Sequence, residues 1–179
     1  MVLLHDPSHT DALLPNPTEG RTRQRVAVDD TRNPLTRKAY EIWNRTRGER
    51  PYPRREELPL RDLRDLLRYA VLFRVLDGGE DFEVRIMGDA IVVGLGRSFQ
   101  GKTLHDVEAA IPGYGSALCK AYRYVIETRE PIAFRGWYDR DPTKRAYFQE
   151  SVVLPLGPEN GPPDHLFAVI VYAQTAEAL

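Results

Sequence analysis

The segment 95–102, LGRSFQGK, carries the residue types closest to a chemical motif in this 179-residue chain. Spaced glycines before a lysine bind phosphate when they open a helix directly after a strand. Here the glycines are predicted at the end of a short helix, where they let the backbone turn tightly. The sequence has no nucleophile elbow and no helix with paired histidines. It therefore predicts a protein that is not an enzyme.

Arg85 lies in the middle of a predicted strand, on the face opposite Phe82, Val84 and Ile86. Two roles are open for its guanidinium. It either points outward and pairs with a carboxylate such as Glu150, or it enters a pocket and binds an anion. The outward, structural role is favoured.

The composition limits the class of protein. A length of 179 residues fits one domain with its own core, and a net charge of −1 gives no overall attraction to nucleic acid or membrane. The single cysteine, Cys119, cannot form an internal disulfide or a cysteine-based zinc site, and is interpreted as a buried structural thiol. No apolar run approaches transmembrane length, so we expect a cytoplasmic protein without a metal site.

Two regions are predicted along the chain. Residues 1–33 are rich in Pro, Thr, Asp and Arg and lack apolar periodicity, which predicts a flexible N-terminal arm. Residues 34–179 form the predicted folded domain. The arm is interpreted as a solvated segment, with folding onto a partner as the alternative.

The domain is predicted to open with a helix. Asn33 is a suitable cap and Pro34 is tolerated in the first turn. Ile42 and Trp43 lie on the apolar face of this helix, which needs to pack against the outer face of a sheet or against a second copy of the chain. We therefore predict that the helix takes part in a homodimer contact.

A hairpin follows. Residues 69–76 alternate in polarity as a strand does, and Asp77-Gly78-Gly79 supplies the positive φ that a tight turn requires. Phe82, Val84 and Ile86 continue the alternation on the return strand. The remaining predicted elements are a short helix at 60–68, a short helix that Asp89 caps, a long helix at Tyr114–Thr128, and strands at Ile132–Tyr138, 145–156 and 165–175.

This order of elements is similar to the PAS fold, in which a five-stranded antiparallel sheet curls around helices inserted between its second and third strands. The chain most resembles the single-domain PAS-like proteins common in alphaproteobacteria, the PAS_5 family, over residues 34–173. The resemblance is carried by Tyr40 and Trp43, the segment 53–67, FEVRIMG, IVVGLGRSFQG and the helix at 118–131 with its ETREP ending. It implies an α+β fold and a bacterial sensory or regulatory module.

The resemblance also implies where a ligand would lie, between the concave sheet face and the central helices. An apolar wall with few polar anchors is typical of such a pocket. The residues expected to line it are Phe73, Ile86, Ile91, Leu95, Tyr122, Phe134 and Gln149.

No cofactor is predicted. His105 lies in the region from which haem-binding PAS proteins take an axial ligand, but a lone histidine beside Asp106 is more typical of a helix end or a surface. The Asn-Cys-Arg motif of flavin-binding light sensors is absent. An unknown small molecule remains a possible ligand.

The leading hypothesis is a cytoplasmic sensory or regulatory module that binds a small ligand, a protein partner, or both, and has no catalytic output domain of its own. The expected partners are a second copy of the chain and a downstream protein, with no nucleic acid and no membrane. One alternative is a pure protein-interaction or dimerisation module with a filled core. A further alternative is a small enzyme on a cone-shaped α+β fold, which the hairpin ahead of the central helices disfavours.

Overall fold

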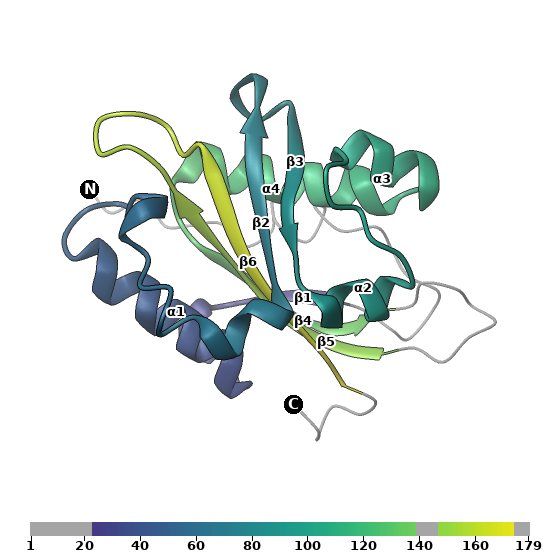
Figure 1. Ribbon diagram of the computed structural model, residues 1–179, viewed down its shortest axis with the longest axis horizontal. Coiled ribbons are helices and arrows are strands. Elements are labelled where there is room, and N and C mark those ends of the chain that lie inside the picture. The colour runs from purple at the N-terminus through teal and green to yellow at the C-terminus, as the bar shows by residue number, and fades with distance from the viewer. Residues whose placement is uncertain (1–22, 139–146, 174–179) are drawn as a thin grey trace.

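The computed structural model describes residues 23–138 and 147–173, which fold around one antiparallel sheet (Figure 1). The order across this six-stranded sheet is β1-β4-β5-β6-β2-β3. The strands are β1 (Arg23–Val26), β2 (Ala70–Leu76), β3 (Asp81–Met87), β4 (Ile132–Tyr138), β5 (Tyr147–Leu156) and β6 (His165–Ala173). The predicted α+β architecture, with helices between the hairpin and the later strands, is confirmed. The sheet has one strand more than the five expected.

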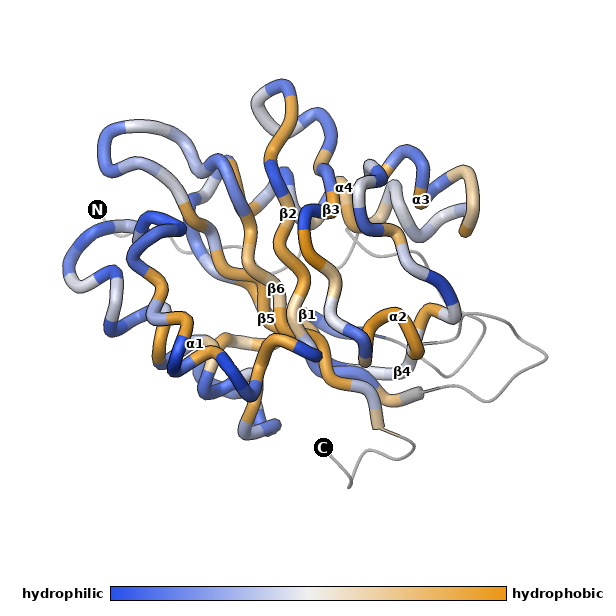
Figure 2. The backbone as a smooth tube through the Cα atoms, in the orientation of Figure 1, coloured by the Kyte–Doolittle hydropathy of each residue, from blue (hydrophilic) through white to orange (hydrophobic). Residues whose placement is uncertain are grey.

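Helices pack on both faces of the sheet. We call the face toward α2 (Asp89–Leu95), α3 (Leu104–Ala110) and α4 (Tyr114–Thr128) the inner face, and the face toward α1 (Pro34–Arg47) the outer face. Each face buries its own apolar cluster. Figure 2 shows apolar residues along the central strands β5 and β6, and an alternation of apolar and polar residues along α1. Central strands that are apolar on both faces therefore join two cores.

Helix α1 begins as the sequence predicts. The side chain of Asn33 accepts a hydrogen bond from the backbone N–H of Leu35, and Gly48 ends the helix with a positive φ of 59°. Ile42 and Trp43 are 4% and 2% exposed, and both belong to the outer-face cluster. The apolar face of α1 therefore packs against the sheet of its own chain, which was one of the two destinations considered.

Residues 23–33 differ from the expected flexible arm. Arg23 to Val26 pair with β4 in antiparallel register, from Arg23 opposite Gly136 to Val26 opposite Ala133, and Val28–Asp30 form a 3-10 turn. The sequence RQRV hides this strand because its alternation places arginines, not apolar residues, on the inner face. Residues 1–22, the rest of the predicted arm, lie outside the described residues.

A β-bulge changes the expected course of the hairpin. Phe73 pairs with Val84, but Leu72 pairs with Ile86, so Arg85 is an extra residue on β3. A single extra residue reverses the alternation that follows it. Val84 faces the helices, whereas Ile86 turns to the other face and is 51% exposed. The prediction that Ile86 lies on the pocket face is therefore wrong.

Smaller differences concern the ends of elements. Gly88, not Asp89, is the N-cap of α2, and Asp89 lies in its first turn. The helix predicted at 60–68 is a 3-10 helix, η5, at Arg64–Tyr69. The long helix α4 and strand β4 have the predicted bounds. The predicted start of β5 at residue 145 and the predicted end of β6 at residue 175 fall outside the described residues.

Candidate functional site

The inner face carries the candidate site, where the resemblance placed a ligand. Phe73, Ile91, Leu95 and Tyr122 line one cavity of about 30 Å³ between the sheet and the helices. Its other walls are apolar and aromatic side chains from β2, β3, β6, α3 and α4 and from the loop between α2 and α3. The sequence therefore identified four of the side chains that meet here.

A second cavity of about 10 Å³ lies next to the first. Phe134 and Gln149 line it, and Tyr122 borders both cavities. The Tyr122 ring packs against Phe73 with centroids 4.9 Å apart. Its burial raises the pKa of the Tyr122 phenol, which stays neutral at any physiological pH. Six of the seven predicted residues thus lie around this interior, and Ile86 does not.

Three polar side chains and one glycine form a row across the inner face, and the sequence did not predict this row. Arg23, Gly136, Gln149 and Tyr172 are directly opposite one another on β1, β4, β5 and β6, so they share a face. Arg23 Nη1 donates to Gln149 Oε1 at 3.3 Å. The sequence could not show this row because its members come from four separate strands. One of these strands, β1, falls within the segment predicted as a flexible arm.

The phenols of Tyr114 and Tyr172 extend this row toward the helices. Burial raises the pKa of the Tyr114 phenol, against the lowering effects of Arg23 and of a hydrogen bond with Tyr172. A Cβ at Gly94 would lie 2.6 Å from the Tyr172 ring, so the missing side chain lets α2 approach β6. The interior therefore has an apolar cavity between the sheet and the helices, with polar side chains at the side of the smaller cavity.

As far as the described residues show, the interior between the sheet and the helices is filled by its own side chains. Pockets that take drug-sized ligands have volumes of roughly 300–1,000 Å³. The two cavities, of about 30 and about 10 Å³, have room for little more than single water molecules. In this conformation the expected pocket residues other than Ile86 belong to a packed interior.

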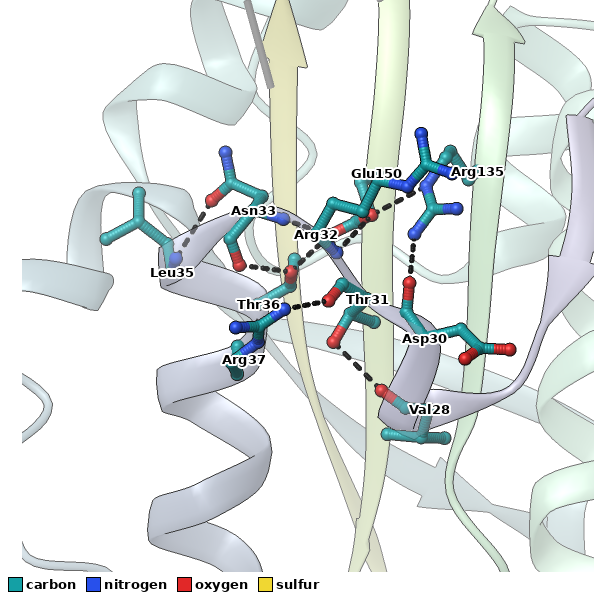
Figure 3. Close-up of polar contacts among 10 residues, drawn as sticks. All are labelled: Val28, Asp30, Thr31, Arg32, Asn33, Leu35, Thr36, Arg37, Arg135 and Glu150. Atoms are coloured by element: carbon teal, nitrogen blue, oxygen red, sulfur yellow. Dashed lines mark hydrogen bonds and ion pairs between the residues drawn. The ribbon is translucent and has the colours of Figure 1, made fainter.

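The outer face holds a buried carboxylate in the centre of β5 (Figure 3). Glu150 is fully buried, and its Oε2 lies 2.8 Å from Arg135 Nε. It accepts hydrogen bonds from the backbone N–H groups of Arg32 and Asn33 and from the Thr36 hydroxyl. We call this group the Glu150 clamp. It fixes the start of α1 to the middle of the sheet.

The clamp also determines the ionisation of Glu150. Burial alone would raise the pKa of this carboxyl group. The hydrogen bonds from Thr36, Arg32, Asn33 and Arg135 outweigh burial and lower the pKa below the ordinary value of 4.5. Glu150 is therefore ionised at neutral pH. Arg85, considered earlier as its partner, is exposed and pairs instead with Glu83 at 2.8 Å.

A larger, open groove of about 560 Å³ runs between α1 and the connection from α4 to β4. Tyr40, Arg47, Arg129 and Glu130 are among its lining residues. Arg47 packs over the buried Trp43 ring, 5.2 Å from its centroid. The groove carries both signs of charge beside aromatic surface, and sequence patterns did not reveal it because its walls come from separate elements.

His105 and Cys119 line neither of the two interior cavities. His105 is 74% exposed in side-chain area, and its Nδ1 lies 2.5 Å from Asp81 Oδ2. Burial raises the pKa of the Cys119 thiol to about 11, so little thiolate forms at neutral pH. Within residues 23–138 and 147–173, no group of three or more His, Cys, Asp or Glu side chains could hold a metal ion.

The described helices include none that is long and apolar enough to cross a membrane. A family model described as a PAS domain matches residues 31–171. Neither the curated proteins nor the solved structures gave a match. The matched region contains α1, the hairpin and the central helices, and it ends in β6, but it leaves out β1.

Proposed function

We propose that this chain, which belongs to the PAS domain family, is a regulatory module that works through contact with another protein. PAS domains are generally non-catalytic sensory or regulatory modules. The observation that supports a contact-based module is the filled interior, with cavities of only about 30 and about 10 Å³. A module with a packed core has its surface available for recognition.

The open groove beside α1 is the surface we favour for that contact. It combines the partly exposed Tyr40 ring with charged side chains from three parts of the chain, Asp29, Arg47, and the pair Arg129 and Glu130. Aromatic and arginine side chains are enriched at the energetic centres of protein interfaces. Tyr40, Trp43 and Arg47 of α1 line the groove, and the Glu150 clamp fixes the start of this helix. The binding of a partner in the groove would therefore depend on the position of α1.

A homodimer through α1 remains a prediction. Ile42 and Trp43 are already buried against the sheet, so such a dimer would have to use the exposed, polar side of the helix. Light scattering after size-exclusion chromatography would measure the mass in solution directly. A monomer at micromolar concentration would remove this prediction without affecting the proposed contact with a different protein.

The filled core can be tested with Phe134→Ala, matched to Phe167→Ala on the outer face. Both phenylalanines are buried, at 4% and 6% exposure. If the interior is a packed core, each substitution leaves a void and costs about 3–5 kcal/mol in the free energy of unfolding, measured by urea denaturation. Native mass spectrometry of protein purified from its own host should give the mass of the chain without a bound compound.

A small-molecule sensor is the second candidate, and the polar row on the inner face favours it. Arg23, Gln149 and Tyr172 converge at one side of an apolar chamber, as the few polar anchors of ligand pockets do. The proposed ligand contacts are Phe73, Ile91, Leu95, Tyr122, Phe134 and Gln149. A co-purifying compound, together with a Phe134→Ala cost well below that of Phe167→Ala, would replace the contact-based proposal with this one.

A further inference from the structure

Strand β1 supplies a charged side chain to the interior from outside the family match. The PAS domain match begins at residue 31, whereas β1 spans Arg23–Val26. Among the described residues that line the two interior cavities, Arg23 is the only charged one. The strand therefore lies outside the matched region, and its Arg23 side chain borders the smaller interior cavity.

The reach of Arg23 depends on Gly136. Arg23 and Gln149 lie on either side of Gly136, in the same row and on the same face of the sheet. Gly136 has no side chain to stand between them, and its φ of 147° is one that other residues rarely adopt. The guanidinium of Arg23 therefore extends over β4, lies 5.4 Å from the centroid of the Phe134 ring and donates to Gln149.

A second arginine covers the adjoining part of the interior. Arg25 lies over the Tyr124 ring of α4, 4.7 Å from its centroid. Arg23 and Arg25 both project to the inner face, since residues two apart in a strand share a face. Together they close the side of the interior that lies between β4 and α4.

The attachments of β1 are weak compared with those of the segment that follows it. Its described partners are four residues of β4, one neutral amide at 3.3 Å, and two aromatic rings. Arg32 and Asn33 instead bind a buried, ionised carboxylate in the Glu150 clamp. The carboxylate receives the backbone N–H groups of Arg32 and Asn33 at 2.9 and 2.8 Å and Arg135 Nε at 2.8 Å, whereas Arg23 makes one hydrogen bond to Gln149, which is long at 3.3 Å. The structure thus changes from loosely to firmly attached between Val26 and Arg32.

We propose that β1 is a lid on the interior, and that Arg23 and Gln149 form its clasp. When the clasp opens, residues 23–26 separate from β4 while the Glu150 clamp keeps α1 in place. Opening uncovers Phe134, Gln149 and Ser151 and connects the smaller cavity to solvent. This lid goes beyond the proposed function, because it operates whether the interior admits a small molecule or stays filled by its own side chains.

Thiol labelling of the full-length chain tests the lid. In a Cys119→Ser background, Ser151→Cys places a reporter on the inner face beside the smaller cavity, and Val152→Cys places one on the adjacent, outer face. Both positions are buried, at 4% and 0% exposure. Adding Arg23→Ala should speed labelling of the inner reporter about tenfold, because it removes one hydrogen bond and one ring contact. The outer reporter should keep its rate.

The control is Gln24→Ala, at an exposed position of the same strand, which should change neither rate. Equal acceleration of both reporters by Arg23→Ala would mean global opening and would overturn the lid, as would no acceleration of the inner reporter. Hydrogen exchange of the wild-type chain gives a result that does not depend on any variant. The amides of β1 that bond to β4 should exchange faster than the paired amides of β5, and equal protection would also reject the lid.

Discussion

The two faces of β5 treat buried polar groups in opposite ways. On the outer face, Glu150 is ionised and receives donors from Arg135, from two backbone amides and from Thr36. On the inner face, its neighbour Gln149 is neutral and accepts one hydrogen bond, at 3.3 Å, from Arg23 among the described residues. The smaller cavity, of about 10 Å³, borders this amide.

This difference indicates that the outer face holds α1 rigidly, whereas the side chains of the inner face can rearrange. A buried charge is tolerated only when its partners are in place, so the outer face has one arrangement of α1 on the sheet. A neutral amide beside a small cavity can exchange hydrogen-bond partners at lower cost. We therefore expect the outer face to provide rigidity and the inner face to provide any conformational change.

The largest expected effect comes from removing the clamp. Glu150→Ala leaves the partly buried Arg135 Nε and the backbone N–H groups of Arg32 and Asn33 without their acceptor, so unfolding should become easier by about 3–5 kcal/mol. The neighbouring Gln149→Leu keeps the volume and removes one long hydrogen bond, whose donor Arg23 is partly exposed and can turn to water, and it should cost about 1 kcal/mol or less. Urea denaturation of both variants gives the comparison. Similar costs for the two would show that the faces do not differ.

The next effect concerns the bulge in β3. Ile91→Ala removes methyl groups from a fully buried side chain of the inner-face cluster and should cost about 2–5 kcal/mol. The same change at Ile86, on the exposed side of the bulge, should cost no more than about 0.5 kcal/mol. Thermal and urea unfolding would measure both. A large loss in the free energy of unfolding from Ile86→Ala would mean that this side chain is buried, and would contradict the exposure that we attribute to the bulge.

A smaller difference is expected in the response to acid. The pKa of Glu150 is lower in the folded chain than its ordinary value of 4.5. Its ionised form therefore stabilises the fold fully above that value, and this contribution is lost as the pH falls below 4.5 toward the folded-state pKa. Unfolding free energies measured from pH 6 to pH 3 should fall more steeply for the wild type than for Glu150→Gln. Parallel curves would mean that the clamp does not stabilise the ionised form.

The sequence predicted those elements whose own residues carry the signal. Asn33 and Pro34 marked the start of α1, and the apolar spacing of α4 gave its bounds. Six of the seven proposed pocket residues surround the interior because alternation on a strand and spacing on a helix both identify buried faces. Whether they bind a ligand remains a prediction.

The features that were missed depend on pairing between distant segments. The bulge at Arg85 is visible only from the register of β2 against β3, and it moved Ile86 to the surface. Strand β1 lacks an apolar alternation because the rings that its arginines cover belong to β4 and α4. Glu150 likewise acquires its role from residues more than a hundred positions earlier in the chain.

The Glu150 clamp also determines how a pull on the N-terminal side would be transmitted. Force applied ahead of Arg23 loads β1 first and detaches it from a single neighbouring strand. It then reaches Arg32 and Asn33, whose amides are held by a residue inside the sheet. The clamp should therefore resist the force at this point. A tether or reporter fused ahead of β1 would strain that strand, while α1 and the two apolar clusters would bear no load.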